Sequence, residues 1–304
     1  MDAPERSVDP ILERYSRVIE YSFPVVQPSY EQTDVIGWQT ANAAVQTAGR
    51  EIFDRLGAYL NVSFIEVTDP LDMNVIAIGV SNQTETVGFA YFPNPDFEVG
   101  MDVFISDDYV APRFVGSETT NFDYEIMLHE IYHALGLKHP FEADGDNTNV
   151  LGSREDTSPY TVMSYNLDPS TFAGDARVLD LMALTALYGV NPSYRLEDDT
   201  YEFSNSSGVF IVDGGGRDTV AYQGSQNVFV DLRSGGHSFI GSKCAYITSA
   251  NPLTISNGSL IENATTGSDN DTIIGNALNN TLSSGGGDDR IFAGEGLDTV
   301  ISGR

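Results

Sequence analysis

Two segments near the N-terminus carry apolar side chains at helical spacing. The first follows Pro10 and contains Ile11, Leu12, Tyr15, Val18 and Ile19, and the second contains Trp38, Ala41, Val45, Ala48, Ile52 and Leu56. Apolar residues three or four positions apart lie on one face of a helix. We therefore predict two amphipathic helices that pack on a sheet.

Four short segments rich in β-branched or aromatic residues predict strands over residues 62–67, 74–80, 87–92 and 102–106. Longer apolar segments predict one helix from about Tyr124 to Leu135 and another from about Ala176 to Tyr188. Mixed helices and strands of this kind indicate an α+β domain, to which we assign residues 1–192.

Beyond Tyr194 the composition changes to Gly, Asn, Asp, Ser and Thr with single aliphatic residues, which predicts an all-β domain over residues 193–304. A nonapeptide repeat occupies about residues 266–304. Its sixth place holds Asp271, Asn280, Asp289 and Asp298, and its eighth place holds Ile273, Leu282, Ile291 and Val300. Each repeat reads as a turn followed by a short strand whose eighth residue faces a narrow core, so two repeats make one coil of a parallel β-roll.

Residues eighteen positions apart should then stack, which pairs Asp271 with Asp289 and Asn280 with Asp298. Stacked carboxylates repel one another unless a hard cation lies between them, and calcium prefers oxygen ligands. We predict a better calcium site at the Asp271/Asp289 pair and a weaker one at Asn280/Asp298. The competing interpretation is a disordered tail rich in Gly and Asp.

The charge of the chain restricts its partners. Forty-four acidic residues against fifteen basic residues give a formal net charge of −29, so nucleic acid and anionic membranes would be repelled.

The single cysteine, Cys244, excludes an intrachain disulfide. No segment approaches the roughly 20 apolar residues of a membrane span, and the N-terminus lacks the pattern of a classical signal peptide. We expect a soluble monomer that is not inserted into a membrane.

Three of the four histidines lie in the segment HEIYHALGLKHP, residues 129–140. His129 and His133 are four positions apart, so a helix presents both rings on one face. Gly136 can end that helix in a left-handed conformation and let His139 return as a third ligand. Three neutral imidazoles leave an open coordination position, as catalytic zinc requires.

Glu130 adjoins the first of these histidines and is placed to act as a general base rather than as a ligand. The alternative interpretation places His129 and His133 on the surface of an ordinary amphipathic helix. It does not explain why Gly136 and His139 complete the longer spacing. The remaining histidine, His237, reads as an ordinary exposed residue.

The segment TVMSY follows, with Met163 and Tyr165. Met163 can form an apolar floor beneath the three imidazoles, although a lone methionine is more often a plain core residue. Tyr165 could reach the metal or a developing oxyanion. The pattern HExxHxxGxxH followed by a methionine turn is the metzincin signature.

These motifs, together with the nonapeptide repeats after LIENATTGSDND, resemble those of the serralysins, the bacterial RTX-bearing metzincin proteases. The resemblance implies that His129, His133 and His139 bind zinc and that Glu130 is the general base. Tyr165 would be a movable fourth zinc ligand, and Met163 the floor of the site. The substrate would add as an antiparallel strand to the edge strand that contains Gly88, Phe89, Ala90 and Tyr91.

The same resemblance implies calcium sites outside the repeats, in the segments RLEDDTYEF, DGGGRD and LIEN. Their ligands would come from Arg195, Glu197, Asp199, Asp213, Gly215, Gly216, Asp218, Leu260 and Glu262. Differences from the family pattern are also visible: Tyr132 and Glu197 each stand where glycine is common in the family, and the linker from His139 to Met163 is shorter.

The fold class that follows is an α+β metzincin-type zincin domain and an all-β, calcium-binding parallel β-roll. The leading hypothesis is a secreted, extracellular bacterial zinc endopeptidase stabilised by calcium. A type I secretion apparatus and a proteinaceous inhibitor are the partners this implies, besides the polypeptide substrate. Two alternatives remain: a calcium-binding surface or matrix protein with an inactive or single-partner zincin domain, and a zinc hydrolase acting on a non-peptide amide.

Overall fold

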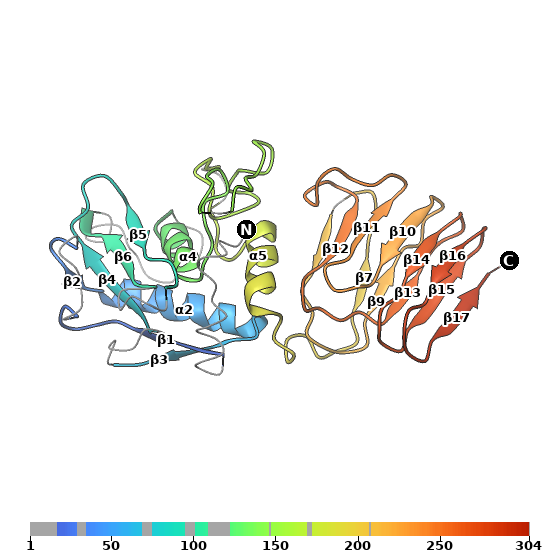
Figure 1. Cartoon of the computed structure of the whole chain (residues 1–304), viewed down its shortest axis with the longest axis horizontal. Helices are drawn as coiled ribbons and strands as arrows, with labels where there is room; N and C mark the ends of the chain where they lie inside the picture. The colour runs from blue at the N-terminus through green and yellow to red at the C-terminus, as the bar shows by residue number, and fades with distance from the viewer. Residues whose placement is uncertain are drawn as a thin grey trace. The chain divides into compact units, whose positions relative to one another are not determined.

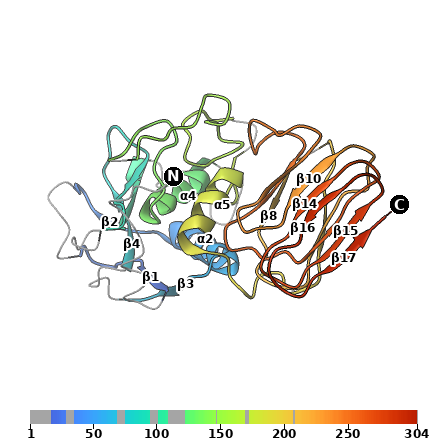
Figure 2. The ribbon, with the colours of Figure 1, turned by 45° about the vertical axis from the view of Figure 1, so that its right-hand side comes forward.

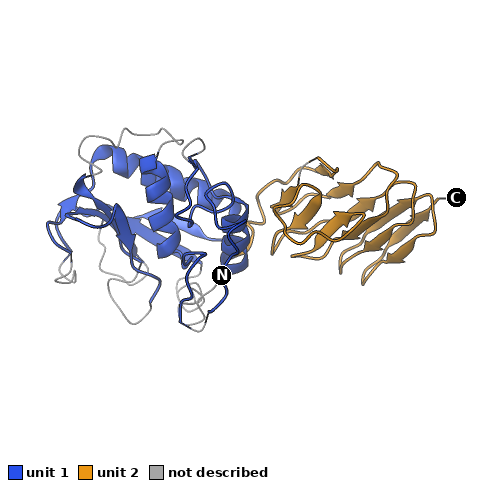
Figure 3. Cartoon of the chain, turned by 90° about the horizontal axis from the view of Figure 1, so that it is seen from above, with its two compact units in different colours: residues 1–188 blue, residues 189–304 orange. Residues whose placement is uncertain are grey.

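The computed structural model describes residues 17–28, 35–68, 75–94, 101–108, 122–145, 147–168, 172–206 and 208–303. The chain divides into two compact units, Met1–Tyr188 and Gly189–Arg304 (Figure 3). The first unit mixes helices and strands, and the second consists of strands.

The first unit is built on one twisted sheet whose strand order is β3-β1-β4-β6-β5, with β2 paired to β4 (Figure 1). Its strands are β1 (Val18–Ser22), β2 (Gln39–Thr40), β3 (Ser63–Glu66), β4 (Val75–Ser81), β5 (Gly88–Ala90) and β6 (Val103–Ser106). The pairs β3-β1, β1-β4 and β4-β6 are parallel, whereas β5 runs antiparallel to β6 at the end of the order. All four strands predicted from the sequence are confirmed to within one or two residues.

The helices of the first unit are α2 (Ala43–Tyr59), α4 (Phe122–Ala134) and α5 (Val178–Tyr188). The side chain of Asn42 caps α2 by accepting hydrogen bonds from the backbone of Ala44 and Val45, which starts the helix there. Gly49 lets α2 approach α4 closely, because a Cβ atom at Gly49 would lie 2.9 Å from Cε of Met127. The three helices confirm the predictions for residues 43–56, 124–134 and 178–188.

Two of the helix predictions near the N-terminus are corrected. The predicted helix that begins at Ile11 is wrong for Val18 and Ile19, which lie in β1; residues 11–16 are outside the described part of the chain. β1 lies between β3 and β4, with Ile19 and Tyr21 buried on alternate positions. The second predicted helix starts later than expected, because Trp38 and Ala41 precede the Asn42 cap.

The second unit stacks its strands in two sheets around a narrow apolar core. One sheet has the order β16-β14-β10-β11-β12-β8 and the other β17-β15-β13-β9-β7, and Figure 2 shows β10, β14 and β16 side by side. The strands are β7 (Thr200–Glu202), β8 (Val209–Ile211), β9 (Thr219–Ala221), β10 (Val228–Asp231), β11 (His237–Ile240), β12 (Pro252–Ile255), β13 (Asn263–Thr265), β14 (Thr272–Ile274), β15 (Thr281–Gly285), β16 (Arg290–Phe292) and β17 (Thr299–Ser302).

The strand register confirms the predicted coil of two repeats. Ile273 pairs with Ile291 in parallel, and Leu282 pairs with Val300, so equivalent residues are 18 positions apart. Ile273 and Leu282 are fully buried, as predicted. Val300 is 51% exposed, against the prediction, because no described strand packs against the outer side of β17.

Candidate metal centre

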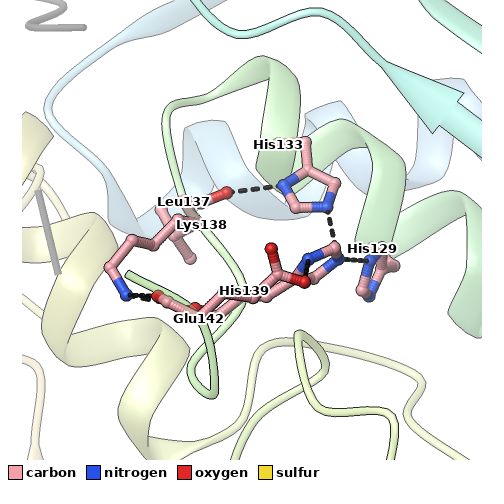
Figure 4. Close-up of polar contacts among 6 residues, drawn as sticks. All are labelled: His129, His133, Leu137, Lys138, His139 and Glu142. Carbon is pink, nitrogen blue, oxygen red and sulfur yellow. Dashed lines mark hydrogen bonds and ion pairs between the residues drawn. The ribbon is translucent and has the colours of Figure 1, made fainter. Parts of the chain in front are cut away.

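The three predicted histidines converge at the C-terminal end of α4 (Figure 4). His129 and His133 lie one turn apart on the helix. Gly136 has φ +96°, and the chain reverses there through hydrogen bonds from Gly136 N–H to the His133 carbonyl and from Leu137 N–H to the Tyr132 carbonyl. This turn returns His139 to the other two rings, as the spacing predicted.

The Nε2 atoms of the three rings face one another. His139 Nε2 lies 3.1 Å from His129 Nε2 and 3.0 Å from His133 Nε2. On the outer side, Nδ1 of His129 is 2.9 Å from the Val162 carbonyl oxygen and Nδ1 of His133 is 2.7 Å from the Leu137 carbonyl oxygen. A carbonyl oxygen can only accept a hydrogen bond, so both Nδ1 atoms carry the proton and both Nε2 atoms present lone pairs.

Lone pairs at such short separations repel unless a cation lies between them, so this donor set fits a metal ion. Tetrahedral zinc with Zn–N bonds of about 2.0–2.1 Å would hold nitrogens about 3.3 Å apart, close to the distances found. Burial lowers the pKa of His129 to about 4, which keeps the ring neutral and able to bind metal. Nδ1 of His139 completes the outer contacts at 3.2 Å from Oε1 of Glu142.

Glu130 lies beside the three rings and is 5% exposed. Burial raises the pKa of its carboxyl group to about 8, and its Oε2 has no hydrogen-bond partner among the described residues. The side chain is held against β5, because a Cβ atom at Gly88 would lie 2.8 Å from Cγ of Glu130. A carboxyl group so placed can exchange a proton with a molecule in the cleft.

The segment after the histidines forms a turn that supports them. Met163 is 1% exposed in this turn, next to Val162, whose carbonyl accepts the His129 hydrogen bond. Tyr165 is 63% exposed, and its ring centroid lies 4.6 Å from that of His139 and 5.7 Å from that of His129. The structure therefore brings Glu130 and Tyr165 to the three predicted histidines, and it places Met163 in the adjoining turn.

Two further residues hold the site and were not predicted. Asp180 on α5 is fully buried and accepts hydrogen bonds from Thr161 Oγ1 at 2.6 Å and from Val162 N–H at 2.9 Å. Lys138 is 2% exposed, and its Nζ donates to the carbonyls of His139, Glu142 and Asn149 at 3.1, 2.6 and 2.9 Å. Neither has a local sequence signal, because only the fold brings Asp180 to its partners and because the partners of Lys138 are backbone carbonyls, which every residue possesses.

A cavity of about 400 Å³ contains the three histidines and Glu130 and is bordered by Gly88, Phe89, Ala90 and Phe92. β5 is paired only on its β6 side among the strands that the structure describes. Gly88, Phe89 and Ala90 therefore lie where an edge strand was predicted. The ring of Tyr91 instead packs against Phe89 and Phe104.

The acidic residues predicted from the segments outside the repeats also come together. Carboxylate oxygens of Asp199, Asp213 and Asp218 lie within 4.8 Å of one another, and Asp213 and Asp218 are fully buried. Burial and the neighbouring carboxylates raise the pKa of Asp218 to about 6. Buried like charges at this separation fit a hard cation such as calcium.

Some of the predicted backbone ligands lie next to this acidic cluster. A Cβ atom at Gly216, where φ is +125°, would lie 2.2 Å from the Glu197 carbonyl oxygen, and Gly215 N–H donates to Asp213 Oδ1. Glu262 Oε2 accepts from Asp218 N–H at 2.8 Å. Of the other two predicted ligands, Arg195 has φ +53° and an Nη1 atom 3.2 Å from Tyr201 Oη, and Leu260 has a side chain that is 46% exposed.

The repeat pairs adopt the predicted stacking, with hydrogen bonds that link consecutive coils. Asp271 N–H donates to Asp289 Oδ1, and Asn280 N–H donates to Asp298 Oδ1, both at 2.9 Å. Asp271 is 1% exposed, and burial raises its pKa. The side-chain oxygen of Asn280 accepts a hydrogen bond from Asn276 N–H, and its side-chain nitrogen donates one to the Glu262 carbonyl. The Asn280 side chain therefore already has backbone partners.

Comparison with known proteins identifies the relatives of this chain. The model of the RTX calcium-binding nonapeptide repeat, with four copies, matches residues 265–300. The serralysin of Proteus mirabilis is 30% identical over 303 residues, which cover 87% of this chain and 60% of the relative. The serralysin of Photorhabdus laumondii is 28% identical with the same coverage of both chains, and metallopeptidase AprA of Pseudomonas marginalis is 30% identical over 66% of this chain and 47% of the relative.

A mixed α/β unit with a three-histidine centre is thus followed by a parallel β-roll of calcium-binding repeats. The chain is related to the serralysin and AprA metalloproteases over most of its length, which confirms the resemblance stated from the sequence. It spans about 60% of the length of the two serralysins it matches. No helix in the described part of the chain has the length and apolar content needed to cross a membrane.

Proposed function

We propose that residues 1–192 form a metzincin-type zinc endopeptidase domain and that residues 193–304 form an RTX β-roll domain that stabilises it by binding calcium. The observation that carries this proposal is the convergence of three Nε2 lone pairs beside the buried carboxyl group of Glu130. Relatives named serralysin and metallopeptidase AprA support a peptide substrate.

His129, His133 and His139 would hold the zinc ion, which supplies Lewis acidity to water and to the substrate carbonyl when bound. Glu130 takes a proton from the attacking water at Oε2, which has no hydrogen-bond partner among the described residues, as the new C–O bond forms. It then gives that proton to the amine nitrogen as the C–N bond breaks, so the carboxylate is regenerated. A zinc ion held by the histidines would lower the pKa of Glu130 that burial raises, which favours the carboxylate form that accepts the proton.

Tyr165 lies beside the rings of His129 and His139 with its side chain largely exposed. We assign it the role of a hydrogen-bond donor to the oxyanion that forms on the substrate carbonyl, or of a fourth ligand when substrate is absent. Met163, buried in the turn below, would form the floor of the site.

The substrate would bind as an extended strand antiparallel to β5. The edge position of β5 and its place along the cavity that contains Glu130 and the histidines support this. Main-chain hydrogen bonds to Gly88–Ala90 then provide affinity for any extended polypeptide, and side-chain pockets provide specificity.

Calcium would bind at Asp199, Asp213 and Asp218, and at the repeat pairs Asp271/Asp289 and Asn280/Asp298. Cations at these positions neutralise part of a formal net charge of −29 and convert binding free energy into folding free energy. Calcium-rich surroundings outside the cell suit such a protein, so we propose that it is secreted and works extracellularly.

The experiment that tests this function measures cleavage of an unfolded protein substrate in excess calcium, with and without a zinc-selective chelator. The proposal expects cleavage that the chelator abolishes and that added zinc restores. A folded, zinc-loaded protein that cleaves no polypeptide would contradict it and would favour a calcium-binding surface or matrix protein. A panel of non-peptide amides in the same assay tests the remaining alternative.

A further inference from the structure

A second cavity, of about 370 Å³, adjoins the one that contains the three histidines, and the two share Thr86, Gly88, His129, Glu130 and Tyr165. Its walls are largely apolar, with Val87, Ile126 and Leu167 among them. The charged side chains that line it in the described part of the chain are all acidic, namely Glu85 and Glu125 in addition to Glu130.

Glu125 is the unexplained residue of this cavity. It precedes His129 by one turn of α4 and is 4% exposed. Its Oε2 accepts a hydrogen bond from Ala173 N–H at 2.9 Å, whereas its Oε1 has no hydrogen-bond partner among the described residues. A buried carboxylate oxygen without a donor costs free energy, which a donor on a bound ligand would recover.

Burial raises the pKa of the Glu125 carboxyl group, because it disfavours the ionised form, and the hydrogen bond from Ala173 N–H and the charge of Arg177 only partly oppose this effect. A cation brought next to Glu125 would stabilise the ionised carboxylate. Glu85, which is exposed, adds a second negative charge to the lining of the same cavity.

The side of the scissile bond that this cavity serves follows from the direction of the bound substrate strand, and this step rests on the proposed function. A substrate antiparallel to β5 runs with its C-terminal part toward residues 85–87 and with its N-terminal part toward Phe92. Glu85 and Val87 line this cavity, whereas Phe89, Ala90 and Phe92 line the other, so this cavity receives the side chain following the scissile bond.

We propose that this cavity selects lysine or arginine at the residue immediately after the scissile bond and that Glu125 determines the preference. The aliphatic part of the side chain would pack against Val87, Ile126 and Leu167, and the cationic end would donate a hydrogen bond to Oε1 of Glu125. Long basic side chains combine an apolar stem with a charged end in this way. Charge-assisted hydrogen bonds of this kind are among the stronger ones in proteins.

The test uses otherwise identical quenched fluorescent peptides that carry lysine, arginine, norleucine or glutamate after the scissile bond, with the cleaved bond identified by mass spectrometry. Norleucine matches the stem of lysine without its charge. For the zinc- and calcium-loaded full chain, we expect kcat/KM for lysine to exceed that for norleucine about tenfold or more, the effect of one charge-assisted hydrogen bond. Glutamate should be the poorest substrate.

In Glu125→Gln the lysine-to-norleucine ratio should fall to about one, with cleavage of the norleucine peptide retained. Glu125→Asp should recover part of the ratio, and Glu295→Gln in the second unit serves as the control that leaves it unchanged. The ratio of kcat/KM for the lysine and norleucine peptides does not depend on the fraction of folded enzyme. The ratio measured for the wild type tests the proposal even if a variant fails to fold. Cleavage without a preference for basic residues, or a preference that survives in Glu125→Gln, overturns this inference alone, whereas failure to cleave any peptide overturns the proposed function.

Discussion

The backbone N–H of Val162 donates a hydrogen bond to Oδ2 of Asp180, with 2.9 Å between the two atoms. The carbonyl of the same Val162 accepts a hydrogen bond from Nδ1 of His129. Asp180 also accepts from Thr161 Oγ1 and Arg177 N–H. One buried carboxyl group on α5 thus positions the turn that orients a candidate zinc ligand on α4.

The titration of Asp180 predicts a specific dependence of stability on pH. Burial raises its pKa from 3.8 to about 6, so between these values the folded protein binds more protons than the unfolded chain. The stability contributed by Asp180 is complete below about pH 4 and is lost as the pH rises through about 6. Urea unfolding of the zinc-free protein in calcium should therefore show that the wild type loses stability relative to Asp180→Asn over this range. A difference between the two proteins that does not change with pH would contradict the assignment.

Lys138 should be necessary for the third zinc ligand to be in place. Lys138→Met retains the length of the side chain but leaves the carbonyls of His139, Glu142 and Asn149 without their donor. Loss of the buried cationic donor to these three carbonyls, through part-buried hydrogen bonds, should cost about 2 kcal/mol of the free energy of unfolding. It should also weaken zinc binding, measured by competition with a chelator. The exposed Lys243→Met is the matched control, and equal zinc affinity in the two variants would show that Lys138 does not position His139.

The absence of a side chain at Gly88 should be needed for Glu130, the proposed general base, to occupy its position. In Gly88→Ala the new Cβ would lie 2.8 Å from Cγ of Glu130, so the carboxyl group must move. We expect kcat to fall at least tenfold while zinc content stays at that of the wild type, since the three histidines are not displaced. In Gly152→Ala, where no atom lies within 4 Å of the added Cβ, activity should not change. Full activity of Gly88→Ala would show that kcat does not depend on the position of the Glu130 carboxyl group and would contradict this prediction.

The acidic cluster of the second unit predicts that Asp213→Asn raises the melting temperature without calcium and lowers it with calcium. Asp213→Asn removes one of three carboxylates within 4.8 Å. With calcium chelated, the variant should melt at a higher temperature than the wild type, because repulsion is relieved. In saturating calcium it should melt lower, and its calcium titration midpoint should rise about tenfold or more.

Asp108→Asn, an exposed substitution in the first unit, is the control for a general effect of charge. If Asp213→Asn were more stable than the wild type in both conditions, the cluster would not be a calcium site.

The zinc-site helix could be predicted because its information is local. His129 and His133 at a four-residue spacing, the helix-ending Gly136 and the returning His139 all lie within one short segment. The strand β1 could not be predicted, because Tyr15, Val18 and Ile19 are spaced as they would be on one face of a helix. Its strand conformation comes from pairing with β3 and β4, which are distant in sequence. The nonapeptide register likewise predicted the stacked coils because the repeat is local and periodic.

The supporting residues lay beyond reach of the sequence for a related reason. Asp180 is 51 positions from His129, and only the packed structure brings its carboxyl group to the Val162 turn. Lys138 adjoins His139, yet its role depends on carbonyl groups, which every residue possesses. Glu125 has no pattern that separates it from an ordinary helix carboxylate until its burial is known.

The most direct test of the account is the activity of Glu130→Gln at matched zinc content. Glutamine has nearly the same size and leaves the three histidines intact, but it cannot accept and return a proton at the reacting atoms. We predict a Glu130→Gln protein that binds zinc and calcium with wild-type stoichiometry and whose kcat is reduced at least a hundredfold, within the usual range for loss of a general base. Retention of wild-type kcat by the zinc-loaded Glu130→Gln protein would contradict the assignment of Glu130 as the general base of a metalloprotease.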